Sequence, residues 1–161
     1  MERGRQLVFI VAVAAAAVVL YACVRSCSQT EETRVQRALY GAVAGVEQND
    51  ASRYGRFVSL FYADEEGRNK LALLAAARQL FDEFRPLRVE IKQLKITVAD
   101  DRKTAAAVIG FKCYFKHLPD GKLYYEAGRF EADLTKEERQ WRVRRLRYID
   151  ADEIMFIQAV A

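Results

Sequence analysis

One acidic and two basic residues in the C-terminal half have the chemistry of a ligand-binding site. Glu126 lies in one run of alternating residues, and Arg145 and Arg147 lie in the next. If these runs are neighbouring strands, the three side chains share one face of a sheet. Guanidinium groups match carboxylate and phosphate oxygens, so the combination predicts a site for an anionic or amphipathic ligand. The other pocket candidates on this face are Phe111, Cys113, Phe115 and Tyr124.

Two other interpretations of these charges stay open. Glu126 and the arginines can form a cross-strand ion pair at the sheet edge, worth about 0–1 kcal/mol. A β-bulge after Val143 would instead turn Leu146 and Tyr148 inward and both arginines outward. Glu126 is also the only carboxylate that the pattern places inside, so a general base rests on one residue alone. We therefore assign no catalytic residue.

Three helices followed by four strands would position these side chains. Helical spacing of apolar residues predicts a first helix after Ser28, a second capped by Asp50 and reaching Phe61, and a third that ends before Pro86. The pattern then alternates with period two. The strand candidates are Leu87–Val98, Lys103–His117, Lys122–Leu134 and Arg139–Ile149. Their short, turn-rich links predict an antiparallel meander and an α+β class.

The strand register follows from the same pattern. Pairing His117 with Lys122 and Leu134 with Arg139 aligns alternate apolar residues of three strands at one end of a common face. That face takes Ala105, Ala107, Ile109, Phe111, Cys113, Phe115, Tyr124, Glu126, Gly128, Phe130, Ala132, Leu134, Trp141, Val143, Arg145 and Arg147. The opposite face takes Tyr114, Tyr125 and Tyr148, an aromatic patch that suits a homodimer or another protein partner.

This order of elements resembles the nuclear transport factor 2-like superfamily, also called the cystatin-like or cone-shaped α+β fold. The resemblance covers about residues 31–150. It rests on Val46–Phe84, with "QND" between the first helices and "LLAAARQLFDEF" in the third, and on the closing "QWRVRRLRYID". It implies three N-terminal helices packed on a curved antiparallel sheet of about four strands, with a pocket at the wide end of the cone. Members include isomerases, dehydratases, ligand carriers and non-enzymatic assembly parts, so the fold does not define the function.

An apolar segment precedes this domain. Leu7–Val24 is 18 residues without a charge, and as a helix it would rise roughly 27 Å, close to the hydrocarbon thickness of a bilayer. Leu20-Tyr21-Ala22-Cys23 resembles a bacterial lipobox, which would make Cys23 a lipidation site. An uncleaved transmembrane helix and a lipid-modified Cys23 both stay open, and both place the domain at a membrane, facing the periplasm or the outside of the cell. The expected division is residues 1–27 as anchor or lipoprotein-type signal, 28–150 as the domain and 151–161 as an apolar C-terminal tail.

Charge and cysteine content exclude several classes of protein. The net charge is +4, but Arg3, Arg5 and Arg25 lie in the N-terminal segment, so the remainder is nearly neutral. Strand alternation also divides the arginines of the last strand between two faces, and we expect no nucleic-acid partner. Three cysteines and a single histidine provide neither a disulfide framework nor a zinc ligand set, so we expect no metal or cofactor.

These features predict a membrane-tethered, extracytoplasmic binding or assembly module without catalytic activity. Its layout is similar to that of anchored superfamily members found in secretion and transport assemblies. The alternative is a small-ligand carrier or an acid–base enzyme of the isomerase or dehydratase type that uses the cone pocket. A deep cavity beside Glu126 and Arg145 would favour the alternative, whereas a filled cone with exposed tyrosines would favour assembly.

Overall fold

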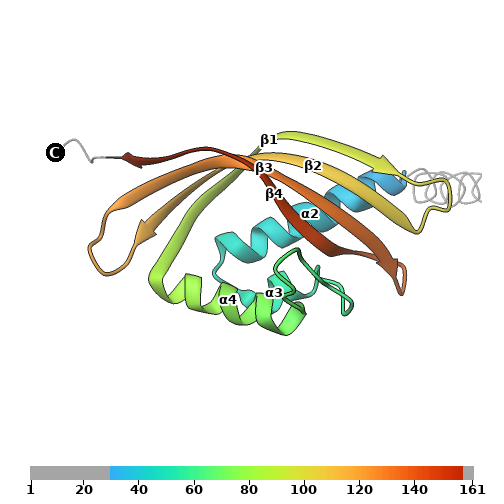
Figure 1. The fold of residues 1–161 in the computed structure, drawn as a ribbon, viewed down its shortest axis with the longest axis horizontal. Helices are drawn as coiled ribbons and strands as arrows, with labels where there is room; N and C mark the ends of the chain where they lie inside the picture. The colour runs from blue at the N-terminus through green and yellow to red at the C-terminus, as the bar shows by residue number, and fades with distance from the viewer. Residues whose placement is uncertain (1–29, 158–161) are drawn as a thin grey trace, which may run out of the picture.

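A curved antiparallel sheet with three helices on its concave side makes up the domain, as the computed structural model describes it for residues 30–157 (Figure 1). The helices are α2 (Glu31–Glu47), α3 (Ala51–Gly55) and α4 (Lys70–Glu83). The strands are β1 (Phe84–Val98), β2 (Thr104–His117), β3 (Leu123–Glu137) and β4 (Gln140–Ile157). They lie in the order β1-β2-β3-β4, so the predicted α+β class with a curved antiparallel meander is confirmed.

The two ends of the chain bear on the expected domain division. The segment expected to be a membrane anchor, including Cys23, lies outside the described residues. None of the helices within residues 30–157 is long and apolar enough to cross a bilayer. At the other end, β4 runs to Ile157, so most of the segment expected as a tail is strand.

Side-chain caps begin all three helices. Thr30, Asp50 and Asn69 each accept a hydrogen bond from the backbone N–H three residues later, at 3.3, 2.8 and 3.0 Å. Such caps satisfy amide groups that have no partner inside the helix. Asp50 caps the second helix as predicted. The N-cap of the first is Thr30 rather than Ser28.

The second helix is much shorter than the apolar spacing predicted. It ends at Gly55, and the chain then runs along the edge of the sheet, where Val143 N donates to Phe57 O at 2.7 Å and Ser59 N donates to Val143 O at 2.8 Å. These bonds to β4 replace the helical ones. Leu60 and Phe61, expected on the buried face of a helix, are therefore 68% and 74% exposed.

The transition from α4 to β1 also differs from the prediction. Phe84 is both the C-cap of α4 and the first residue of β1, so no loop separates the two elements. Pro86 lies within β1 instead of stopping the helix ahead of the strand. This is possible because β1 is an edge strand and its register shifts between Pro86 and Arg88.

The register between β2 and β3 is the predicted one. Ala105 lies opposite Leu134 and Phe115 opposite Tyr124, and His117 N donates to Lys122 O. The register between β3 and β4 is not the predicted one, because β3 continues to Glu137 and the turn falls on the next two residues. Both turn residues have positive φ angles, 48° and 69°, as a tight hairpin turn requires. Leu134 therefore lies opposite Val143 instead of Arg139.

The hydrophobic core occupies one end of the concave face. Its sheet side is formed mainly by small residues, and its helix side comes from α2 and the segment after α3. The buried members are Val35, Ala38, Leu39, Val58, Tyr62, Ala105, Ala107, Ala132, Leu134, Trp141 and Val143. Alanines on the strands let α2 lie close to the sheet, so this end of the cone is narrow and filled.

Candidate functional site

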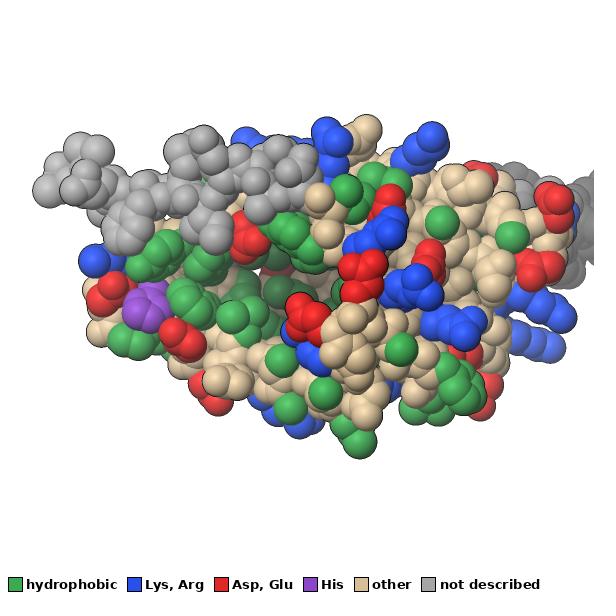
Figure 2. Space-filling model, in the orientation of Figure 1, with side chains coloured by type: hydrophobic (Ala, Val, Ile, Leu, Met, Phe, Trp, Pro, Cys, Tyr) green, Lys and Arg blue, Asp and Glu red, His purple; other side chains and the backbone are tan. Residues whose placement is uncertain are grey.

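The concave face changes from filled to open along the strands. On β2, Ala105 and Ala107 are buried, whereas Phe111 and Cys113 on the same face are only half-buried. On β3, Leu134 is buried and Glu126 is half-buried. Figure 2 shows the recess at this end, surrounded by hydrophobic side chains between the sheet and the helices below it.

One rung of the sheet crosses the middle of this recess. Val89 on β1 lies opposite Cys113 on β2, which lies opposite Glu126 on β3. The backbone N–H of Val89 donates to Glu47 Oε1 at 2.8 Å, so the end of α2 places a second carboxylate on the β1 side of the rung. The backbones of Val89 and Glu126 are two strand spacings apart, about 10 Å, with Cys113 between them.

The pKa of the Cys113 thiol is affected by burial and by both carboxylates. Burial, followed by the charges of Glu126 and Glu47, raises the pKa of Cys113 to about 11. The thiol is therefore protonated at neutral pH and is a poor nucleophile. Its role at this position is that of a small apolar side chain between two acids.

Aromatic rings wall the recess on both sides of the rung. Phe111 stacks on Phe130 with ring centroids 4.8 Å apart, and Phe115 stacks on Tyr124 at 5.6 Å. Phe84, at the end of α4, meets Phe115 edge-on at 5.3 Å. These pairs are cross-strand neighbours, and their geometry is typical of favourable aromatic contacts. They give the recess flat apolar walls.

The arginines expected in the pocket face away from it. Arg144 is an extra residue in β4, because Leu134 lies opposite Val143 while Asp133 lies opposite Arg145. This bulge reverses the alternation. Arg145 then approaches Asp133, with Nε and Oδ2 3.7 Å apart, and both side chains are more than half exposed.

Arg147 follows the same reversed alternation. It lies opposite Glu131 and forms ion pairs with Glu131 and Glu65 on the outer side of the sheet. The expected placement of both arginines beside Glu126 is therefore wrong, and the other interpretation, a β-bulge after Val143 that turns Leu146 and Tyr148 inward and the arginines outward, is confirmed. With the arginines turned outward, the predicted site for an anionic ligand loses its cations.

The bulge turns Tyr148 inward instead. Its ring meets Phe130 edge-on at 5.0 Å, and its hydroxyl donates to Glu126 Oε1 at 3.1 Å. Tyr148 therefore belongs to the recess and not to the outer tyrosine patch. Tyr114 and Tyr125 do lie together on the outer face, with ring centroids 5.5 Å apart and Lys112 Nζ over the Tyr125 ring at 5.4 Å. A partner that uses this outer face stays a prediction.

Glu47 is absent from the residues predicted for the site. Strand alternation is the basis for expecting an inward carboxylate, and it does not extend to a residue at the end of a helix. The signal that could have found Glu47 is position: it is the last residue of α2, two places after the buried Gly45 and directly after the apolar Val46. In the structure this carboxylate reaches the backbone amide of Val89 on β1.

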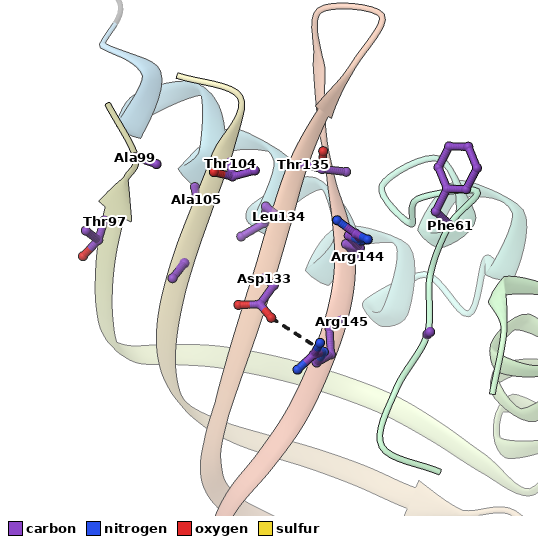
Figure 3. Close-up of a pocket in the computed structure, with 12 residues that line it drawn as sticks. Phe61, Thr97, Ala99, Thr104, Ala105, Asp133, Leu134, Thr135, Arg144 and Arg145 are labelled. Atoms are coloured by element: carbon purple, nitrogen blue, oxygen red, sulfur yellow. Dashed lines mark ion pairs between the residues drawn. The ribbon is translucent and has the colours of Figure 1, made fainter. Parts of the chain in front are cut away.

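A second depression lies on the outer side of the sheet. This groove, about 550 Å³ in volume, is shown in Figure 3 with Asp133 and Arg145 on its floor and Phe61 at its edge. Asp133 and Arg145 pair with each other, and no buried polar group faces the groove among its described lining residues. The recess on the concave side is the better candidate site, because its carboxylates are held between apolar walls.

Metal binding finds no support in this part of the chain. Across the described residues, no three side chains of histidine, cysteine, aspartate or glutamate are grouped as metal ligands. The histidine, His117, lies at the rim of the recess, with Nδ1 2.7 Å from Asp120 Oδ1 and Nε2 3.6 Å from Glu83 Oε1. It links the β2–β3 hairpin to the end of α4.

Comparisons with known proteins identify the fold. A hexachlorocyclohexane dehydrochlorinase, LinA type 2, is similar with a TM-score of 0.68 and 10% identity, over 80% of this chain and 90% of that one. A scytalone dehydratase-like protein from Novosphingobium aromaticivorans has a TM-score of 0.67 and 12% identity, over 75% and 85% of the two chains. An association domain of the calcium/calmodulin-dependent protein kinase II type from Xanthomonas campestris has a TM-score of 0.63 and 10% identity, over 75% and 88%. No family model matches the sequence, and no curated protein matches it.

These neighbours support the cone-shaped fold of the nuclear transport factor 2-like superfamily. They also correct the expected function. Several neighbours carry the names of enzymes, among them two dehydrochlorinases and the dehydratase-like protein, and this favours the alternative over a non-catalytic assembly module. The open recess agrees with that correction, since a filled cone was the feature expected of an assembly part.

Proposed function

We propose that the domain binds a small, largely apolar molecule in the recess and acts on it by acid–base chemistry of the isomerase or dehydratase type. One observation carries the proposal: the half-buried carboxylate of Glu126 lies between aromatic walls and accepts a hydrogen bond from Tyr148, and Glu47 lies at the β1 end of the same rung of Val89, Cys113 and Glu126. Pockets of this kind, apolar with a few convergent polar groups, are typical of small-molecule sites.

Glu126 is the proposed proton acceptor. The hydrogen bond from Tyr148 holds one carboxylate oxygen, and the rings of Phe111 and Phe130 would fix the body of a ligand beside the other. A carboxylate so placed takes a proton from a carbon atom, and the electron pair left behind forms a double bond. Return of the proton at another carbon completes an isomerisation, whereas departure of a leaving group completes an elimination.

Glu47 is the proposed second acid–base group. Its Oε1 is fixed by the Val89 amide, which is a backbone contact and holds the side chain in one direction. The carboxylate lies on the other side of Cys113 from Glu126, so a ligand in the recess would have one carboxylate on each side. The names of the neighbours are consistent with this assignment, because removal of hydrogen chloride or of water both require transfer of a proton from carbon.

Nitrobenzisoxazole provides a direct test with purified full-length chain. This neutral aromatic compound opens to a coloured cyanophenolate when a base removes its ring proton. We expect the protein to accelerate the reaction over acetate at the same concentration, and Glu126→Gln to lower the rate by about 10²–10⁴-fold, the range of general-base catalysis. Glu131→Gln is the matched control, since Glu131 lies on the same strand but faces outward.

Binding without turnover would identify a carrier. If the compound binds in the recess but wild type and Glu126→Gln open it equally slowly, the domain holds ligands and does not transform them. Equal losses in Glu126→Gln and Glu131→Gln would remove the recess from the proposal altogether.

We also propose that the apolar run Leu7–Val24 holds the domain at a membrane. Its support is the sequence alone: 18 uncharged residues, with basic residues on both sides. The full chain should sediment with membranes, and its intact mass should match either the complete chain or a form that starts at lipid-modified Cys23. A soluble, unmodified, shortened chain would contradict both forms.

A further inference from the structure

We infer that the recess selects a small organic cation, a protonated or quaternary amine with an apolar body. This inference rests on the proposed ligand site and adds the charge of its ligand. The observation behind it is that the open end of the concave face combines aromatic walls with carboxylates, while the neighbouring basic side chains of the sheet are turned to the other face.

The inward charges are both negative. Glu126 is the register partner of Cys113 on β3, and Glu47 Oε1 accepts a hydrogen bond from the backbone of Val89, the register partner of Cys113 on β1. Farther out, Glu83 and Asp120 lie beside His117 at the rim, where Asp120 also pairs with Lys122 Nζ at 3.4 Å. The negative charge on which the inference depends is therefore that beside the rung.

Several basic residues of the sheet near this end form ion pairs on its outer side. Arg88 and Lys92 on β1 both pair with Glu90, whose register partner is Lys112. Arg147 on β4 pairs with Glu131. These pairs explain why β1 and β4, although rich in arginine and lysine, supply no positive charge to the described part of the recess wall.

The aromatic side chains that line the recess also suit a cationic ligand. Phe111 and Phe130 present a stacked pair, Phe115 and Tyr124 present another, and Phe84 closes the end near α4. Faces of aromatic rings attract ammonium groups, and aromatic cages are a common way to bind quaternary amines. A carboxylate half-buried among such rings gains a partner when the cation enters, whereas an anion would face two like charges in a poorly hydrated space.

Three probes of similar size separate charge from shape: benzyltrimethylammonium, benzyl alcohol and phenylacetate. Binding to the full-length chain is measured by calorimetry at low and high salt. We expect the cation to bind about tenfold or more tightly than either other probe, a difference in the range of cation–π and ion-pair contacts in a partly dry site. We also expect its affinity to fall at high salt.

Charge removal provides the decisive comparison. Glu126→Gln should weaken binding of benzyltrimethylammonium about tenfold and leave benzyl alcohol unchanged, because the amide keeps the shape of the carboxylate and loses its charge. Glu131→Gln, on the outer face of the same strand, should change neither. Phe111→Leu is an independent variant that keeps the charge and removes one ring, and it should also weaken the cation selectively.

The outcomes separate this inference from the proposed function. Equal binding of the three probes to wild type, tighter binding of phenylacetate, or an unchanged cation affinity in Glu126→Gln would each overturn the inference. If nitrobenzisoxazole is still opened in a Glu126-dependent way, the proposed acid–base function stands without it. Selective cation binding without any opening of that compound would support the inference and contradict catalysis.

Discussion

Tyr148 donates a hydrogen bond to Glu126 across the face of the sheet, although the two are not register partners. Tyr148 lies opposite Phe130 and Glu126 lies opposite Ile154, and the hydroxyl reaches Oε1 at 3.1 Å along the recess. The contact exists because the bulge at Arg144 turns Tyr148 to the concave side. A β4 without that bulge would place Arg147 and Arg145 on this face.

The Tyr148 contact predicts energetic coupling. Tyr148→Phe and Glu126→Ala should show an interaction energy of about 0.5–1 kcal/mol in a double-mutant cycle, the net value of a partly exposed hydrogen bond. Urea titration followed by circular dichroism measures the four free energies of unfolding. Arg145→Ala combined with Glu126→Ala is the matched cycle, and it should be additive, with Arg145→Ala itself within about 0.5 kcal/mol of wild type. Coupling between Arg145 and Glu126 would mean that β4 lacks the bulge.

Trp141 predicts a large loss of stability. It is 3% exposed, packs in the core at the narrow end and donates through Nε1 to Glu31 Oε2 at 2.9 Å. Trp141→Ala should cost about 3–5 kcal/mol, as for other buried large aromatic residues. The unfolding must be followed by circular dichroism, because Trp141 is the single tryptophan of the chain. Leu71→Ala, at a side chain that is 78% exposed, should stay within about 0.5 kcal/mol; a similar loss in both variants would contradict the assigned core.

Glu31 accepts hydrogen bonds from Lys136 Nζ and Trp141 Nε1, and these two bonds predict that the stability depends on pH. The hydrogen bond from Lys136 lowers the pKa of Glu31 below its ordinary 4.5, with support from the Trp141 indole and against the opposing effect of burial. A lowered folded-state pKa means that this stabilisation is fully present above about 4.5 and is lost as the pH falls through the folded value. Glu31→Gln should therefore flatten the acid side of the stability curve measured by urea titration. Glu32→Gln, at the exposed neighbouring residue, should leave the stability curve unchanged. Equal curves for wild type and Glu31→Gln would contradict a stabilising role of the two hydrogen bonds to Glu31.

The β3–β4 turn predicts a gain in stability. Glu138 and Arg139 adopt φ angles of 48° and 69°, a region that costs residues with a Cβ about 1–2 kcal/mol each in unfavourable cases. Replacing the pair by Asn and Gly, which suit such turns, should raise the free energy of unfolding by about 1 kcal/mol without changing the denaturant slope. Lys103→Gly, in another hairpin at a residue without positive φ, should instead cost about 0.5–1 kcal/mol. A loss in the Asn-Gly variant would contradict the turn geometry.

Regular alternation is what made the β2–β3 pair predictable. From Ala105 to Phe115 the residues on one face are apolar without a break, and a turn at Leu118–Gly121 fixes the pairing, so a shift of one residue would turn the whole core face outward. The register that buries the apolar face of β2 is thus also the one that the alternation predicts. The order of helices and strands was predictable for the same reason, since each change of period marks a change of element.

The fourth strand was not predictable to the same extent. Its bulges at Arg144, Ile149 and Asp152 each shift the register. Only the first is indicated by the sequence, where the adjacent Arg144 and Arg145 interrupt the alternation of apolar and polar residues. Whether such a pair marks a bulge or an exposed edge depends on tertiary packing of Leu146 and Tyr148. The predicted length of the second helix was wrong for a related reason. After Gly55 the backbone forms hydrogen bonds with β4 instead of helical ones, and no local sequence pattern indicates such long-range bonds.

Helix α2 joins two places that have so far been described separately. Its first residue, Glu31, is fixed to Lys136 and Trp141, and its last residue, Glu47, carries one of the recess carboxylates. The helix has 17 residues and is about 25 Å long, and a helix resists change in length. It therefore behaves as a rigid strut. An axial displacement of α2 would therefore carry Glu47 with it, and a displacement of about 1.5 Å, the rise of one residue, would break the bond of its carboxylate to the Val89 amide.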